Sequence, residues 1–240
     1  MTIAGSDSGG GAGIQADLKT FAAHGVYGTS VITALTSQNT LGITDIAPVP
    51  LSSIRSQFRA LALDLPFQAL KTGMLGNAAA VEAVSELLGP APLNLVVDPV
   101  FRSSSGSELM DESGLDAYRK RLIPLSLIFT PNLNEAARLL NCAAIETVDA
   151  MREACKSLLA LGCRSVLLKG GHLPGGVCTD LFYDGDFLEL SSPRIDTKNT
   201  HGTGCSLAAA LAANLALGND PRESARRAKN RRVDFSVTKM

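Results

Sequence analysis

Short apolar stretches alternate with helix-like stretches along most of the chain. The apolar stretches are rich in Val, Ile, Leu and Thr and therefore predict buried β-strands, at residues 2–5, 28–37, 43–49, 69–72, 93–97, 125–129 and 163–168. Apolar residues at helical spacing predict helices between them, at residues 14–23, 51–63 and 77–88 and from the segment 130–135 onward. This alternation predicts an α/β fold with a mainly parallel central sheet and helices on both faces.

Two segments nearer the C-terminus add a hairpin and a packed helix. Residues 177–183 and 187–191 are strand-like and are joined around Asp184-Gly185-Asp186, where Asp-Gly supplies the positive φ of a tight turn. Residues 207–217 are rich in alanine and predict a helix that lies close against the sheet. The 240 residues suffice for a full core, and we predict one domain over residues 1–240.

Glycines and a cysteine lie where the alanine-rich helix is expected to begin. Gly202, Thr203 and Gly204 precede it, and Cys205 falls in its first turn. Glycine lets the backbone approach a ligand, and the N–H groups and dipole of a helix N-terminus attract anions. We therefore predict that a phosphoryl group binds there and that the same field favours the thiolate of Cys205. A glycine-rich turn with an inert cysteine explains so short a pattern equally well.

A glycine-rich loop at residues 6–13 separates the first predicted strand from the first predicted helix. Its glycines lack the Gly-x-Gly-x-x-Gly spacing of dinucleotide-binding loops, and it has no Walker Gly-Lys-Ser/Thr. We interpret the loop as backbone that approaches a ligand, with a structural turn as the alternative.

Polar residues follow several predicted strands at their carboxyl ends, where α/β sheets bind ligands. Gln38 offers both a donor and an acceptor, which suits the edge of an aminopyrimidine or similar ring, although a plain loop glutamine fits the same pattern. Asp98 and Lys169 follow two later strands, and residues 101–106 have the polar composition of a lid. These side chains predict a small-molecule site at one edge of the sheet.

Composition narrows the class of partner. The net charge is −1, and 19% of the residues are charged, so the chain has no electrostatic footprint for nucleic acid or an anionic membrane. The five cysteines form no Cys-x-x-Cys pair, which argues against disulfides and structural zinc and favours a reducing compartment. No apolar run approaches the roughly 18 residues of a membrane span. We expect a cytoplasmic protein whose partners are small molecules.

Eight blocks of the chain, taken together and in order, resemble the hydroxymethylpyrimidine/phosphomethylpyrimidine kinases of thiamine biosynthesis, members of the ribokinase superfamily. The blocks are residues 2–8, 10–20, 38–40, 71–74, 98–100, 130–135, 168–172 and 197–205. The resemblance implies a ribokinase-like three-layer sandwich. It implies ATP-dependent phosphorylation of 4-amino-5-hydroxymethyl-2-methylpyrimidine and then of its monophosphate to the diphosphate. ATP and Mg²⁺ are the implied cofactors, K⁺ is left open, and a homodimer with an interface near residues 29–48 is expected.

The resemblance also implies roles for residues on the substrate side. Gln38 would hydrogen-bond the aminopyrimidine, whose pocket would be lined by Gly5, Ala12, Asp17, Met74 and Val100. On the phosphate side, Asn132 and Glu135 would organise Mg²⁺ and the phosphates, with Asp98 as a second metal-binding carboxylate. Lys169 would neutralise ATP phosphate charge. The remaining nucleotide contacts and the anion hole would come from Thr200, Gly202, Thr203 and Gly204.

Cys205 is assigned the role of general base. Sugar kinases of the superfamily carry aspartate at this position, and a helix N-terminus lowers a cysteine pKa toward neutrality. We hypothesise that Cys205 deprotonates the hydroxymethyl group in the first transfer. It would matter less in the second, because a phosphate acceptor is already anionic at pH 7. His172 and His201, in glycine-flanked turns, are assigned to backbone capping or loop packing.

Two departures from the family pattern leave alternatives open. The glycine loop reads Ser8-Gly9-Gly10-Gly11, where the family usually has one more hydroxyl or proline. The tail, residues 229–240, is atypical, so part of the wall around adenine is expected to be missing or rebuilt. A pyridoxal or pyridoxine kinase is one alternative function. A non-catalytic homologue that binds pyrimidine or nucleotide is the other.

Overall fold

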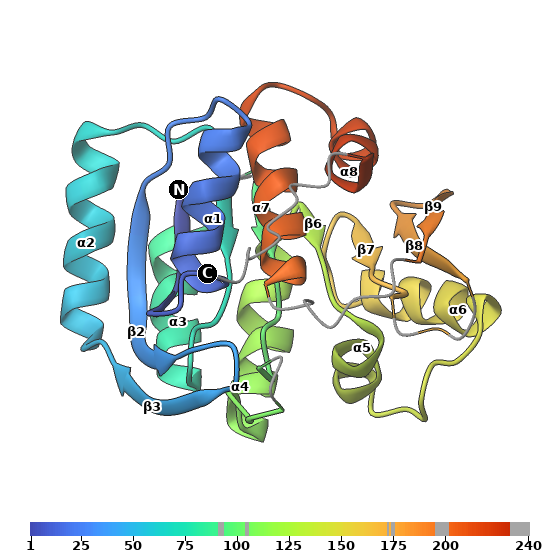
Figure 1. The fold of residues 1–240 in the computed structure, drawn as a ribbon, viewed down its shortest axis with the longest axis horizontal. Coiled ribbons are helices and arrows are strands. Elements are labelled where there is room, and N and C mark those ends of the chain that lie inside the picture. The colour runs from blue at the N-terminus through green and yellow to red at the C-terminus, as the bar shows by residue number, and fades with distance from the viewer. Residues whose placement is uncertain (91–93, 104–105, 172, 174–175, 195–201, 231–240) are drawn as a thin grey trace.

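One sheet of nine strands runs through the part of the chain described by the computed structural model, residues 1–90, 94–103, 106–171, 173, 176–194 and 202–230 (Figure 1). Its pairings are parallel from β2 through β7, and β3, β8 and β9 join antiparallel at the two edges. The predicted mainly parallel sheet is confirmed. Across the sheet, the strands follow in the order β3 (Ile43–Pro48), β2 (Ser30–Gln38), β1 (Thr2–Asp7), β4 (Leu70–Thr72), β5 (Leu95–Val97), β6 (Ile128–Phe129), β7 (Val166–Leu168), β8 (Val177–Tyr183) and β9 (Phe187–Pro193).

Helices cover both faces of this sheet, as predicted. One face packs against α1 (Gly13–Ala23), α7 (Thr203–Ala216) and α8 (Pro221–Asn230). The other packs against α2 (Leu51–Asp64), α3 (Ala78–Leu88), α4 (Glu112–Ala117), α5 (Leu133–Leu140) and α6 (Val148–Leu159). In β5, Leu95 and Val97 belong to the second core and Val96 to the first, because successive strand residues point to opposite faces.

The central strands are shorter than predicted, and three helices, α4, α6 and α8, were not predicted. β6 comprises only two residues, because a π-helical turn (Tyr118–Leu122) and a 3₁₀ turn (Ile123–Leu125) occupy the chain before it. Helices α4 and α6 lie in stretches to which no element was assigned. The buried residues of α6 nevertheless recur at helical spacing, at Met151, Ala154, Cys155 and Leu158.

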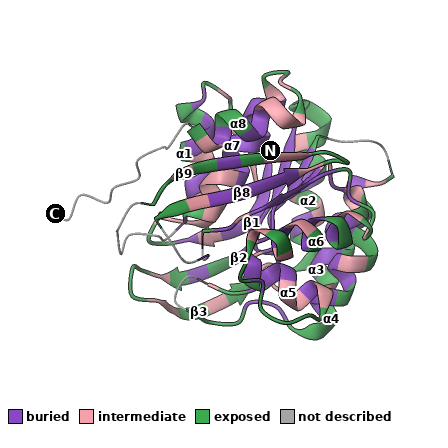
Figure 2. Cartoon of the chain, turned by 90° about the vertical axis from the view of Figure 1, so that its right-hand side faces the viewer, coloured by how far each residue is buried: buried purple, intermediate pink, exposed green. Residues whose placement is uncertain are grey.

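The parallel strands bring their carboxyl ends to the same edge, where several helices also begin. Asp7 ends β1, while Asp98 follows β5 and Lys169 follows β7. β1 and most of β8 are buried, whereas β3 is mostly exposed at its edge of the sheet (Figure 2). Ligands bind at such an edge in open α/β sheets, so the fold places the polar strand ends where a site is expected.

The segment predicted to be a lid starts from the core. Phe101 is buried against Tyr118, at 5.1 Å between ring centroids, and Leu109 N–H donates to the carbonyl of Phe101. Between them, Arg102 and Ser103 lie at the cavity, and residues 104–105 are outside the described part. Of the atypical tail, Lys229 and Asn230 are described, and they end α8.

Candidate active site

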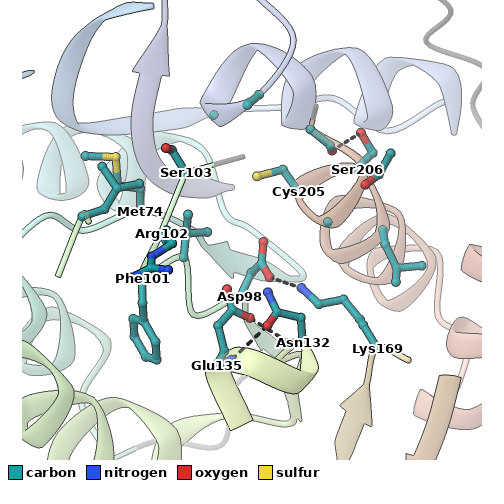
Figure 3. Close-up of a pocket in the computed structure, with 18 of the residues that line it drawn as sticks. Met74, Asp98, Phe101, Arg102, Ser103, Asn132, Glu135, Lys169, Cys205 and Ser206 are labelled. Atoms are coloured by element: carbon teal, nitrogen blue, oxygen red, sulfur yellow. Dashed lines mark hydrogen bonds and ion pairs between the residues drawn. The ribbon is translucent and has the colours of Figure 1, made fainter. Parts of the chain in front are cut away.

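A cavity of about 1400 Å³ opens at the carboxyl edge of the parallel strands (Figure 3). The sequence-predicted residues that line it are Gly5, Ala12, Gln38, Met74, Val100, Asp98, Asn132, Glu135, Lys169, Gly202, Thr203, Gly204 and Cys205. Thr200, His172 and His201 lie outside the described residues. The fold therefore gathers residues from distant parts of the sequence around one space.

One end of the cavity has an apolar wall and an oriented amide. Met74 packs with Ala34 and Leu109, and a Cβ at Gly5 would lie 3.3 Å from the Met74 sulfur. Gln38, at the end of β2, accepts a hydrogen bond at Oε1 from Thr36 Oγ1, at 3.0 Å. This combination suits a flat ring with polar edges, because the apolar wall takes the ring face and the amide takes its edge.

Asp17 differs from the prediction. Its side chain is fully buried and does not line the cavity, so its predicted place in the pocket wall is wrong. Both carboxylate oxygens instead accept hydrogen bonds from Lys71 Nζ, at 3.0 and 2.9 Å, and Thr2 Oγ1 donates to one of them at 2.7 Å. Lys71, which was given no role, lines the cavity. The sequence could have indicated a role for Lys71, because a lysine within the predicted buried strand 69–72 is unusual.

Asp7 organises the glycine loop and was also missed. Its buried carboxylate accepts hydrogen bonds from the N–H groups of Gly9, Gly11 and Ala12, at 2.8, 3.0 and 2.8 Å. The loop thus carries its own anionic cap, and α1 has no other side-chain cap. The sequence could have indicated this role, because Asp7 comes shortly before the glycines of the loop and aspartate side chains accept hydrogen bonds from nearby backbone N–H groups.

Two glycines let this loop approach the start of α7. Gly202 has φ +77°, and a Cβ there would overlap the Gly11 carbonyl oxygen. Gly13 has φ +56°, and a Cβ there would overlap the Gly5 carbonyl oxygen. Both positions require glycine because of their backbone conformation and because of the neighbouring chain. The N-termini of α1 and α7 consequently lie side by side at the cavity.

Asp98, Lys169, Asn132 and Glu135 form a charged cluster on the floor of the cavity (Figure 3). Lys169 Nζ lies 2.9 Å from Asp98 Oδ1. Asn132 and Glu135 form a capping box at the start of α5, in which Asn132 Oδ1 accepts from Glu135 N–H and Glu135 Oε2 accepts from Asn132 N–H. The Asn-x-x-Glu pattern therefore fixes this turn by local hydrogen bonds and presents a carboxylate to the cavity.

Burial and charge in this cluster shift the pKa of its three ionisable side chains, Asp98, Glu135 and Lys169. Burial, together with the Asp98 charge, raises the pKa of Glu135 to about 7, while Lys169 acts in the opposite direction. Although burial opposes them, Lys169 and Lys71 hold the pKa of Asp98 below its usual range. The two carboxylates also raise the pKa of Lys169 against the effect of its burial, so it stays protonated.

The two carboxylates fit a divalent cation shared with phosphates. Within the described residues, no group of three or more His, Cys, Asp or Glu side chains could hold a metal by itself. Mg²⁺ needs only one or two protein carboxylates when phosphate oxygens and water complete its octahedron. The raised pKa of Glu135 supports the fit, because a cation beside it would stabilise its ionised form.

Cys205 points from the first turn of α7 into the cavity (Figure 3). Burial raises the pKa of its thiol to about 11, the Lys71 charge acts against this, and Asp98 adds to it. The predicted lowering toward neutrality is therefore wrong. The cost of desolvating a thiolate in this wall is the largest influence on this pKa and exceeds the opposing effect of the Lys71 charge.

A third ion pair, partly buried, also lies in the cavity wall. Asp180 on β8 accepts a hydrogen bond from Gly170 N–H at 2.9 Å and one from Lys229 Nζ at 2.6 Å. Asp180 and Lys229 both line the cavity, and neither was predicted. The pair ties α8 to the turn that carries Lys169.

Comparison with protein families places this chain within one of them. The family model for phosphomethylpyrimidine kinase matches residues 7–231. The hydroxymethylpyrimidine/phosphomethylpyrimidine kinase of Haemophilus influenzae is 44% identical over 236 residues, which cover 96% of this chain and 87% of that protein. The chloroplastic thiamine biosynthetic bifunctional enzyme of Arabidopsis thaliana is 50% identical over 232 residues, which cover 95% of this chain and 44% of that protein. This chain spans less than half of that longer relative.

Solved structures with the same fold include kinases for two vitamins. An ADP complex of Bacillus subtilis pyridoxal kinase has a TM-score of 0.87 and 39% identity, and the match covers 95% of this chain and 87% of that one. Phosphomethylpyrimidine kinase from Clostridium difficile 630 has a TM-score of 0.83 and 40% identity, with 95% of each chain covered. None of the helices in the described residues has the length and apolar character needed to cross a bilayer.

Proposed function

This chain belongs to the phosphomethylpyrimidine kinase family, and we propose that it phosphorylates 4-amino-5-hydroxymethyl-2-methylpyrimidine and then its monophosphate, with ATP as donor. The observation that carries the proposal is the arrangement of the cavity. An apolar wall with the Gln38 amide lies at one end, and the Asp98–Lys169 pair and the start of α7 lie beyond it. A pyrimidine ring bound against the apolar wall and Gln38 would direct its 5-substituent toward the Asp98–Lys169 pair and the start of α7.

The charged cluster supports binding of the nucleotide phosphates and Mg²⁺. Lys169 would neutralise phosphate charge, and the N–H groups from Gly202 to Gly204 would receive the oxygens of the transferring group. Asp98 and Glu135 would hold Mg²⁺. When bound, the metal neutralises charge on the phosphoryl oxygens. Thr200 stays a predicted nucleotide contact outside the described residues.

The first transfer requires that the hydroxymethyl proton leaves. We infer that it passes to the Cys205 sulfur as the oxygen's electron pair forms a bond to the γ-phosphorus, while the bond to the bridging oxygen breaks toward ADP. Because the pKa of Cys205 is about 11, only a small fraction of the thiol is ionised at pH 7. The second transfer has an anionic phosphate acceptor and needs no such base.

The decisive experiment offers MgATP with the pyrimidine alcohol, its monophosphate and pyridoxal in separate reactions and follows the products by mass. Monophosphate and diphosphate formation with little pyridoxal product supports the proposal. Preferred phosphorylation of pyridoxal would favour the alternative, which the similarity to Bacillus subtilis pyridoxal kinase motivates. Stabilisation by ligands without any product would favour a non-catalytic binding protein. Omitting Mg²⁺ or K⁺ from the same assay tests whether the activity requires that ion.

The β2–β3 hairpin supports the proposal of a homodimer. Leu35 and Leu41 are large apolar residues that are 53% and 88% exposed on or beside these strands. Large apolar residues exposed beside the edge strand β3 favour self-association. Light scattering after size-exclusion chromatography measures the oligomeric state. A Leu35→Lys/Leu41→Lys variant should shift a dimer toward the monomer. A cytosolic location is part of the same proposal and is tested by fractionation.

A further inference from the structure

A lysine and an aspartate are buried as an ion pair in the wall of the cavity, and the proposed reaction so far gives them no part. Both side chains of the Lys71–Asp17 pair are 0% exposed. Burying two ions costs several kcal/mol each, and apolar side chains of similar volume often stabilise a core as well or better. Stability alone therefore does not account for the pair.

The lysine lies in the same cavity wall as the reacting groups. Lys71 comes from β4 and lines the cavity together with the Asp98 carboxylate and the Cys205 thiol. Gly73 leaves space for it, since a Cβ there would lie 2.8 Å from Lys71 Nζ. Among the described residues, Asp17 is the one hydrogen-bond partner of this nitrogen, which has three N–H donors.

Lys71 is also the cation that acts most strongly on the Cys205 thiol. Burial raises the pKa of the thiol, and the Lys71 charge is the largest influence in the opposite direction, larger than the opposing effect of Asp17. The pair therefore acts on the sulfur as a net positive group. The charged and polar groups that face the thiol are those of Asp17, Asp98, Lys71 and Lys169 and the Gly13 N–H.

We propose that Lys71 is a positioning residue, oriented and kept charged by Asp17, that stabilises negative charge on the Cys205 sulfur. The inference rests on the proposed phosphoryl transfer. Lys71 forms and breaks no covalent bond, and the proton that leaves the acceptor passes to the sulfur. The buried pair is retained because its cation favours the thiolate that accepts the proton in the first transfer.

The test replaces both members together, as Lys71→Met with Asp17→Leu, because this leaves no unpaired buried charge. Iodoacetamide alkylation is followed for each cysteine by peptide mass across pH, since the thiolate is the reacting form. We expect alkylation of Cys205 at pH 8 to slow by about tenfold, the change that one pKa unit produces. The exposed Cys142 is the internal control, and Lys156→Met on the surface is the matched variant.

Kinetics and a second pair of substitutions complete the test. The double variant should lower kcat for the alcohol by about tenfold with KM nearly unchanged, and should affect the monophosphate less. Lys71→Gln with Asp17→Asn keeps a hydrogen bond without charge and should slow alkylation similarly, so the test survives if the first variant does not fold. An unchanged Cys205 profile in either folded variant overturns the proposal. If the wild-type chain phosphorylates no pyrimidine, the proposed function fails, whereas alkylation still tests the Lys71 effect.

Discussion

Lys169 Nζ lies 2.9 Å from Asp98 Oδ1, although 71 positions separate the two residues in the sequence. Asp98 follows β5 and Lys169 follows β7, and the two-residue strand β6 lies between these strands. The parallel order of the sheet therefore brings the two charges to one edge. Their attraction keeps Lys169 protonated and Asp98 ionised in a wall that would otherwise disfavour both charges.

Substituting Lys169 should separate its effect on ATP from its effect on folding. We expect Lys169→Met to lower kcat/KM for ATP by roughly 100- to 1000-fold, because it removes a charge aimed at the transferring phosphoryl group. It should also lower the free energy of unfolding by about 3–5 kcal/mol, because Asp98 stays buried without its partner. Steady-state kinetics and urea denaturation measure the two effects. The surface variant Lys156→Met should change neither, and a Lys169→Met protein with unaltered ATP kinetics would contradict the assignment.

Glu135 should make stability depend on pH. Its pKa is raised, chiefly by burial, from 4.5 to about 7, so the folded chain binds this proton more tightly than the unfolded chain does. Its contribution to the free energy of unfolding is therefore present below pH 4.5, falls as pH rises to about 7, and changes no further above that. Glu135→Gln should flatten this fall in urea denaturation at pH 5, 6, 7 and 8. The exposed Glu153→Gln is the control, and an identical slope in Glu135→Gln would refute the assignment.

Removing the Asp7 carboxylate should loosen the glycine loop. In Asp7→Ala the N–H groups of Gly9, Gly11 and Ala12 lose their acceptor, at a cost of about 1–3 kcal/mol in the free energy of unfolding. KM for the pyrimidine should rise severalfold, since Ala12 lines the cavity. Asp111→Ala is a matched control, because Asp111 caps α4 through Gly114 N–H and should affect stability alone. A normal KM in Asp7→Ala would show that loop order is not needed for binding.

A methyl group at Gly202 should force the two loops apart. Gly202→Ala combines a positive φ with overlap of the Gly11 carbonyl, whereas Gly218→Ala combines φ +86° with open space. The second variant therefore measures the cost of backbone strain alone, about 1 kcal/mol. Gly202→Ala should lose clearly more stability and most of the activity, as followed by Tm and product formation. Equal Tm losses in the two variants would mean that the close approach is unimportant.

Most of the fold could be predicted from the sequence because it is encoded locally. Alternating strand-like and helix-like stretches predicted the layers, and Asn132 with Glu135 carried a capping signal readable over four residues. The length of strand β6 was misjudged, because the apolar residues before it form the 3₁₀ turn Ile123–Leu125, in which Ile123 is buried.

The errors within the site have a different physical origin. Asp17 has the same sequence neighbours whether it lines a pocket or pairs with Lys71, and only the packing of α1 against β4 decides between these. The pKa of Cys205 likewise depends on how deeply α7 is covered and on charges contributed by other strands. A motif at a helix N-terminus predicts the direction of the local field but not the cost of desolvation, which is a property of the assembled wall.

Cys205 provides the sharpest test of how the two transfers differ. Below its pKa of about 11 the thiolate fraction grows about tenfold per pH unit, so turnover of the alcohol should rise between pH 7 and 9 while turnover of the monophosphate stays flatter. Cys205→Ala should lower kcat for the alcohol by about 100-fold, should lower it by less than tenfold for the monophosphate, and should remove the rise with pH. Cys178→Ser, at another thiol that lines the cavity, should preserve both rates and both profiles. Equal losses for the two acceptors in Cys205→Ala would mean that the thiol shapes the site without taking a proton, because a general base is needed only where the acceptor still carries one.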